Sequence, residues 1–187
     1  VGSEMCIRDS PYSDSIYIVG ATDGGGNGGF DVLVLKYDLE GNLQWYRTWG
    51  DSGDDIGYDL LIYSNSIFIT GYTTTTSTNE DVLLLKYDLN GNYIGNYTFG
   101  GLGSDKGTAI FEDSDFIYIV GFEYLPALYK YTCLVLKYTT DGSNVWSNTW
   151  GQTNYNTTYD LFIYSDKIFV VGSMPVYHSY MNDIVII

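Results

Sequence analysis

The segment DVLLLKY at residues 81–87 decides the fold, because the chain repeats it almost letter for letter. It reads DVLVLKY at residues 31–37, TCLVLKY at residues 132–138 and DIVII at residues 183–187. The period is therefore 50 to 51 residues, and self-similarity at such a period indicates stacked supersecondary units. Two further series keep the same step, glycines that end runs such as YIVG and aromatic residues that precede a glycine in runs such as TWG. Their members are Gly20, Gly71, Gly121 and Gly172, and Trp49, Phe99 and Trp150.

Each repeat unit predicts a set of short β-strands. In the second unit these are residues 56–63, 67–72, 81–87 and 92–99, separated by turn residues. Runs this short and this evenly spaced predict an antiparallel meander. The third run is apolar at every position from Val82 to Leu85, which is typical of a strand covered on both faces. Sheets stacked face to face predict an all-β fold, namely a partial β-propeller of four-stranded antiparallel blades.

The repeat register divides the chain into blades. We expect a partial first blade over residues 11–50, full blades over residues 51–100 and 101–151, and a partial fourth over residues 152–187. Residues 1–10, VGSEMCIRDS, match no repeat position and resemble the translation of a sequencing adapter, so we exclude them from the fold. Closed propellers typically have roughly 4 to 8 blades. We therefore expect a fragment whose partners include the remaining blades of the same chain, and which aggregates or assembles when it is expressed alone.

The charge of the chain argues against several classes of partner. Acidic residues number 23 against 8 lysines and arginines, which gives a net charge of −15. Such a chain repels phosphate backbones, so we expect no nucleic acid partner. No apolar run approaches the length of about 18 residues that a membrane-spanning helix needs.

Aspartate-rich turns join the third and fourth strands. They read DLEGN at residues 38–42 and DLNGN at residues 88–92, and the third unit has TTDGS at residues 139–143. Glycine suits a positive φ, and aspartate side chains can accept hydrogen bonds from turn amides. Spaced oxygen ligands would also suit calcium, but no acidic residue follows at the spacing of a calcium loop. We therefore expect turn chemistry with no cofactor or metal, and calcium remains the alternative.

Two acidic positions recur from unit to unit, one before the first strand and one at the start of the third. Repetition in successive blades favours a structural role, because a catalytic site needs several different groups that converge once. We expect the same role for the recurring glycines, and we expect Trp49 and Trp150 to pack between blades. The first acidic position holds Asp55, Asp105 and Asn156, and the second holds Asp31, Asp81 and Asp183, with Thr132 as the exception.

The loops between second and third strands differ in every unit. They span residues 23–30, 74–80, 123–131 and 174–182, and variable loops on a repeated scaffold are where recognition is normally placed. His178 lies in the last loop, but a lone imidazole without a second ligand or a nucleophile is typical of a surface residue. The last two loops are rich in tyrosine. If the chain binds a ligand, we expect contacts from Tyr124, Tyr129, Tyr131, Tyr177 and Tyr180.

The repeat resembles a known family. GYT followed by a loop, then DVLLLKYD, GN, TWG and GDDIG, is similar to the SBBP-type β-propeller repeat of large bacterial and archaeal surface or secreted proteins. The resemblance covers residues 11–187. It implies an extracellular or cell-surface location, and it assigns no catalytic residue.

Two functional hypotheses follow, and the sequence favours the first. The first is a non-catalytic module of a cell-surface or secreted protein, not an enzyme, that binds protein or glycan or serves structural display. The alternative is a fragment of a propeller-fold enzyme, a lyase or hydrolase, with Asp55 and Asp105 at the channel mouth. Acid and base roles need environments that push two pKa values apart, whereas equivalent blade positions tend to have equivalent environments.

Overall fold

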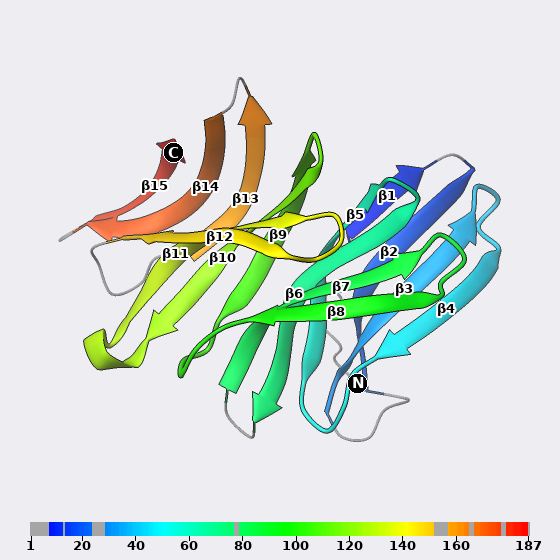
Figure 1. Ribbon diagram of the computed structural model, residues 1–187, viewed down its shortest axis with the longest axis horizontal. Coiled ribbons are helices and arrows are strands. Elements are labelled where there is room, and N and C mark those ends of the chain that lie inside the picture. The colour runs from blue at the N-terminus through cyan, green and yellow to red at the C-terminus, as the bar shows by residue number, and fades with distance from the viewer. Residues whose placement is uncertain are drawn as a thin grey trace.

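The computed structural model describes residues 8–12, 14–23, 29–76, 79–151, 157–164, 167–176 and 179–186. In this part of the chain, antiparallel strands form four sheets that stand side by side, from the first blade in blue and cyan to the fourth in orange and red (Figure 1). The predicted all-β fold of antiparallel sheets, stacked in the predicted blade order, is therefore confirmed. The first sheet contains β1 (Arg8–Tyr12), β2 (Ser15–Thr22), β3 (Asp31–Asp38) and β4 (Leu43–Trp49). The second sheet contains β5 (Asp55–Tyr63), β6 (Ser66–Thr76), β7 (Asn79–Asp88) and β8 (Tyr93–Phe99). The third sheet contains β9 (Lys106–Asp113), β10 (Phe116–Leu125), β11 (Lys130–Thr139) and β12 (Asn144–Trp150), and the 3₁₀ turn η1 (Pro126–Leu128) joins β10 to β11; the fourth sheet contains β13 (Thr157–Tyr164), β14 (Lys167–Val176) and β15 (Ser179–Ile186).

Each sheet is a simple meander in chain order. The first strands of successive blades contact one another, since β5 lies against β9 and β9 lies against β13. These strands therefore form one edge of the stack, and β4, β8 and β12 end their sheets at the other edge (Figure 1). Among the described residues, no helix has the length and apolar character needed to cross a membrane.

The apolar core lies between the blades. Side chains alternate along β7, so that Leu83 and Leu85 belong to the core shared with the first blade, and Val82 and Leu84 to the core shared with the third. This confirms the prediction that the third strand is covered on both faces. Fully burying one such side chain stabilises the fold by about 1.5–3 kcal/mol. Trp49 packs against the core of the first two blades, as Phe99 and Trp150 do against the next two cores.

The recurring glycine of the second strand has a steric cause. A register shift between Gly57 and Asp59 interrupts the pairing of β5 with β6, and a Cβ placed on Gly71 would lie 1.8 Å from the carbonyl oxygen of Ile56. Gly121 meets the carbonyl of Lys106 in the same way, at 1.9 Å. A β-bulge pushes the backbone of the first strand toward the second. Only glycine, which has no Cβ, leaves room for the displaced backbone of the first strand.

The first sheet differs from expectation at its N-terminal strand. β1 pairs with β2 from Arg8 opposite Val19 to Tyr12 opposite Ser15. The first blade thus has all its strands, and it uses residues 8–10, which we had excluded because they match no repeat position. Backbone hydrogen bonds do not depend on side-chain identity, and the free edge of β2 accepts any segment that can reach it.

The turns between third and fourth strands are closed by their own aspartates. Asp88 Oδ1 accepts hydrogen bonds from the backbone amides of Asn90 and Asn92, both at 2.8 Å, and Oδ2 accepts one from the Asn92 side chain at 2.7 Å. The backbone and side-chain hydrogen bonds from Asn92 lower the pKa of Asp88. Gly91 has φ +78°. The turn chemistry predicted from DLNGN therefore uses both carboxylate oxygens of this residue.

Candidate functional site

One end of the blades carries a group of acidic residues from the first three blades. Asp55 in β5, Thr73 in β6 and Asp81 in β7 lie opposite one another across three neighbouring strands. Because neighbouring strands are antiparallel, the start of each first strand and the loop between the second and third strands share this end. We call this end the acidic face. It carries Asp31, Asp54, Asp55, Glu80, Asp81, Asp105 and Glu123.

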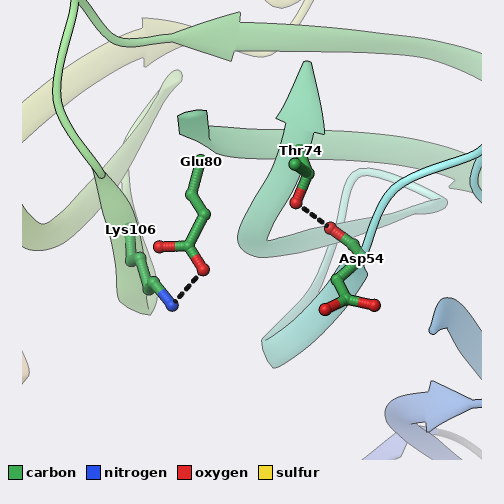
Figure 2. Close-up of polar contacts among 4 residues, drawn as sticks. All are labelled: Asp54, Thr74, Glu80 and Lys106. Atoms are coloured by element: carbon green, nitrogen blue, oxygen red, sulfur yellow. Dashed lines mark hydrogen bonds and ion pairs between the residues drawn. The ribbon is translucent and has the colours of Figure 1, made fainter. Parts of the chain in front are cut away.

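An ion pair joins the second and third blades at this face. Figure 2 shows the side chains of Glu80 and Lys106 pointing toward one another, with Oε1 and Nζ 2.7 Å apart and relative exposures of 25% and 19%. The Lys106 ammonium also lies 3.9 Å from the ring centroid of Tyr72. Burial raises the pKa of the Tyr72 hydroxyl, with further contributions from Tyr58, Glu80 and the Asp54 carboxylate. The Tyr72 hydroxyl therefore stays protonated beside these carboxylates.

A second carboxylate at this face, that of Asp54, belongs to a residue whose backbone is held by Thr74. Thr74 donates to the Asp54 carbonyl oxygen from both Oγ1, at 2.7 Å, and its backbone amide, at 3.1 Å. Figure 2 shows the Asp54 carboxylate turned away from Thr74. Its Oδ1 accepts a hydrogen bond of 2.9 Å from the Phe30 amide of the first blade. Asp54 is exposed, so a ligand at this face can reach it.

Glu123 lies at the same face on the third blade. The side chain is half-buried, and burial raises the pKa of this carboxyl. Next to it in the chain, Tyr124 forms a tilted aromatic pair with Tyr131, with ring centroids 4.8 Å apart. Phe122 packs edge-on against Tyr131 at 5.5 Å. The hairpin of β10 and β11 therefore carries a half-buried acid on one face and a group of aromatic rings on the other.

The structure brings together two of the five tyrosines that we expected to bind a ligand, Tyr124 and Tyr131. Tyr129 lies at the hairpin tip with φ +49° and a relative exposure of 80%. Tyr180 lies in β15 with its backbone opposite Pro175. Tyr177 lies outside the described residues, as does His178. The aromatic binding surface thus remains a prediction, carried by the hairpin of the third blade.

The recurring aspartates are enclosed at the acidic face. Asp105 has no exposed surface, and its carboxylate accepts hydrogen bonds from the backbone amides of Gly101, at 2.9 Å, and Tyr124, at 3.0 Å. Burial raises the pKa of Asp105 to about 6, although these two hydrogen bonds oppose the shift. The amide of Asp105 donates to the carbonyl of Glu80 at 2.6 Å, as the amide of Asp55 donates to Phe30.

Asp55 is also fully buried, so neither aspartate can touch a substrate in this arrangement, contrary to the channel-mouth position of the alternative hypothesis. These residues join one blade to the next. Asp183 lies in β15 opposite Gly172, and Asn156 lies outside the described residues.

Sequence reasoning missed Asp54, Glu80, Lys106 and Glu123. Each occurs once, because the corresponding residue of the next or the preceding unit differs; Lys106, for example, takes the place of Ile56. The repeat pattern identified only residues that recur from unit to unit. These four residues could have been found by the opposite criterion, a charged side chain at a position where the neighbouring unit has a different residue.

Solved structures of known proteins share this fold, although no family model and no curated protein matches the chain. An exo-1,5-α-L-arabinanase from a bovine ruminal metagenomic library matches with a TM-score of 0.54 and 12% identity, over 96% of this chain and 72% of that protein. A thermostable family-43 glycoside hydrolase matches with a TM-score of 0.55 and 15% identity, over 97% and 68%. The β-propeller domain of the trilobed protease from Pyrococcus furiosus matches with a TM-score of 0.56 and 12% identity, over 100% and 56%.

This comparison contradicts the expectation that the chain is a non-catalytic module and not an enzyme. Two of these three neighbours are glycoside hydrolases that align with nearly the whole chain, which agrees better with the alternative of a hydrolase fragment. The symmetry argument was misleading because it considered only residues that recur, whereas Glu80 and Glu123 do not. At such low identity the likeness establishes the fold, and activity becomes a proposal.

Proposed function

We propose that the chain forms part of a propeller-fold glycoside hydrolase whose acidic face binds carbohydrate. Most glycoside hydrolases use two carboxyl groups in different environments beside the scissile bond. The observation that supports the proposal is that two glutamates of neighbouring blades lie near the start of β9 in different environments, since Glu80 contacts Lys106 and the charge of Glu123 acts on Asp105. Glu80 is paired with the Lys106 ammonium, whereas Glu123 is half-buried with a raised pKa.

The two environments suit different chemical roles. A carboxyl whose pKa is raised by burial holds its proton to higher pH and is suited to act as a general acid. Glu123 would give this proton to the glycosidic oxygen as the bond to the anomeric carbon breaks. Glu80 would face the positive charge that develops at that carbon, and a water molecule that attacks the carbon would complete the hydrolysis and return a proton to Glu123.

The aromatic hairpin would supply a binding surface for a sugar ring. Tyr124 and Tyr131 form an aromatic pair on the hairpin that also carries Glu123, on the other face of that hairpin, and aromatic side chains combine a large apolar area with a polar tip. We propose further that additional blades complete the site and that the repeat is of the SBBP type. An extracellular location would give such an enzyme access to polysaccharides.

The test is hydrolysis by the full-length protein of a panel of polysaccharides that begins with arabinan. We expect reducing sugars to be released, and Glu123→Gln and Glu80→Gln each to lower the rate by about 10²–10⁴-fold, the range for loss of an acid or base. The matched control is Glu112→Gln, which changes a glutamate at the opposite end of β9 and should leave the rate unchanged. Full activity in both site variants would refute the assignment of residues, and no release of sugar from any substrate would refute the function.

A further inference from the structure

Two junctions between blades are built alike. In each, an aspartate that begins a third strand and an aspartate at the start of the next blade face one glycine. A Cβ placed on Gly50 would lie 2.2 Å from Asp31 Oδ1 and 2.7 Å from Asp55 Oδ2, and the values at Gly100 are 2.1 and 2.8 Å. The two carboxylates of a junction therefore lie close together. The first junction comprises Asp31, Gly50 and Asp55, and the second comprises Asp81, Gly100 and Asp105.

The second junction satisfies its carboxylates with hydrogen-bond donors from the chain. Asn79 Nδ2 donates to Asp81 Oδ1 at 3.1 Å and to the carbonyl oxygen of Gly101 at 3.0 Å. The Tyr124 amide donates to Asp105 Oδ1 at 3.0 Å. One side-chain amide and one backbone amide thus donate hydrogen bonds to the two carboxylates of this junction.

The first junction lacks both of these donors. Asp31 Oδ1 and Asp55 Oδ1 are buried and accept no hydrogen bond, and the two residues are only 2% and 0% exposed. The position of Asn79 is taken by Gly29, which has no side chain. The position of Tyr124 is taken by Thr74, whose amide donates to the Asp54 carbonyl oxygen instead. Two buried carboxylates at one site are therefore left with an unmatched oxygen each.

The surroundings of the first junction increase its negative charge. The segment GDSGDD places Asp51 and Asp54 where the following unit has Gly101 and Ser104. The place of Lys106 is taken by Ile56, so this ammonium has no counterpart here. Burying charges that have no counter-charge costs several kcal/mol for each ion.

We propose that the first junction binds a hard divalent cation of the calcium type through the carboxylates of Asp31 and Asp55, and that the second junction binds none. Calcium accepts about 6–8 oxygen ligands from carboxylates, backbone carbonyls and water. In the described part of the chain no group of three or more histidine, cysteine, aspartate or glutamate side chains could hold a metal. Carbonyl oxygens and water would therefore complete the shell. At the third junction both acids are replaced together, by Thr132 and Asn156.

Terbium luminescence of the 187-residue chain tests the site directly, because Tb³⁺ replaces Ca²⁺ and emits when a nearby tryptophan is excited. Trp49 precedes Gly50 and pairs with Val32, which follows Asp31. Phe99 occupies the corresponding place at the second junction. We expect tryptophan-sensitised emission that Ca²⁺ suppresses by competition.

Variants at the two junctions show which junction produces the terbium emission. Asp31→Asn with Asp55→Asn should abolish the emission that Ca²⁺ suppresses. The matched pair Asp81→Asn with Asp105→Asn should leave it unchanged. Equal emission from both pairs of variants, or its loss only in the second pair, would overturn the proposal.

Thermal melting separates a cation from a shared proton. After chelation, Ca²⁺ should raise the Tm of the wild-type chain and not that of Asp31→Asn with Asp55→Asn. In chelator this double variant should melt at or above the wild-type temperature, because the amides remove the repulsion between carboxylates. If the wild-type Tm does not change with Ca²⁺ but rises as the pH falls, the proposal is refuted, and the two carboxyl groups share a proton instead.

Discussion

The carboxylate of Asp59 in β5 accepts a hydrogen bond from the backbone amide of Ile110 in β9, with Oδ2 and N 3.0 Å apart across the junction of the second and third blades. Its other oxygen, Oδ1, accepts one from the Leu60 amide at 2.9 Å. Asp59 is only 2% exposed, and it lies at the register shift of β5. The bulge therefore places a charged acceptor between the first strands of two blades.

Replacing this acceptor should weaken the contact between the blades. We expect Asp59→Ala to lower the free energy of unfolding by about 2–3 kcal/mol, because two buried amides lose a charged partner. Asp160→Ala is the matched control, since Asp160 is exposed at the same position of β13 and accepts a hydrogen bond from the Leu161 amide of its own strand. A surface change of this kind should cost no more than about 0.5 kcal/mol. Equal losses in urea denaturation would show that the contact to Ile110 does not stabilise the fold.

The recurring glycine of the second strand should not tolerate a methyl group. Gly71→Ala would place a Cβ 1.8 Å from the Ile56 carbonyl oxygen, so the bulge of β5 must shift. We expect a loss of about 3 kcal/mol or more in the free energy of unfolding, the upper range for overpacking. The control is Gly101→Ala, because a Cβ there meets nothing within 4 Å. If both variants unfold at the same denaturant concentration, steric demand does not explain why this glycine recurs.

The buried carboxyl of Asp105 should make stability depend on pH. Burial raises the pKa of Asp105 to about 6, above its ordinary value of 3.8. The unfolded chain therefore loses this proton at lower pH than the folded chain does. The stabilisation is complete below the ordinary value and is lost as the pH rises through about 6. The wild type should lose about 2 kcal/mol relative to Asp105→Asn between pH 4 and pH 7.

Denaturation of both proteins across this pH range measures the difference. Asp141→Asn serves as a control of opposite sign, because the Thr139 hydroxyl and further hydrogen bonds lower the pKa of Asp141. The advantage of the wild type over this variant should be present above the ordinary pKa and be lost as the pH falls. If the difference between wild type and Asp105→Asn does not change with pH, Asp105 keeps its ordinary pKa in the folded chain.

Most of the architecture was predictable because it depends on local patterns that repeat. The continuous run from Val82 to Leu85 has no polar residue to face water, so the strand needs a sheet on either side. The turns DLEGN and DLNGN close through their own aspartates. β1 was not predictable in this way, because it pairs through its backbone and shares no side-chain pattern with the repeat.

The candidate site was predictable only in part. The sequence pointed to the loops between second and third strands, and Tyr124 and Tyr131 do meet there. Nothing in the sequence spacing brings Glu80 next to Lys106, because the two residues belong to different blades and approach only when the sheets stack. The comparison with solved hydrolases contradicts the expectation that the chain is not an enzyme, and that expectation had considered residues one repeat at a time.

The sequence by itself determined the all-β class, the repeat length, the blade register and the double-sided burial of the third strand. These properties arise from residues that are near one another in the chain and from the alternation of side chains along a strand. The tertiary structure alone decided which charges meet across a junction, that Asp31 Oδ1 and Asp55 Oδ1 lack the donors that Asp81 Oδ1 and Asp105 Oδ1 have, and that Glu123 is half-buried. Electrostatic interactions depend on distance and burial rather than on sequence separation, and both are set only when the blades pack together.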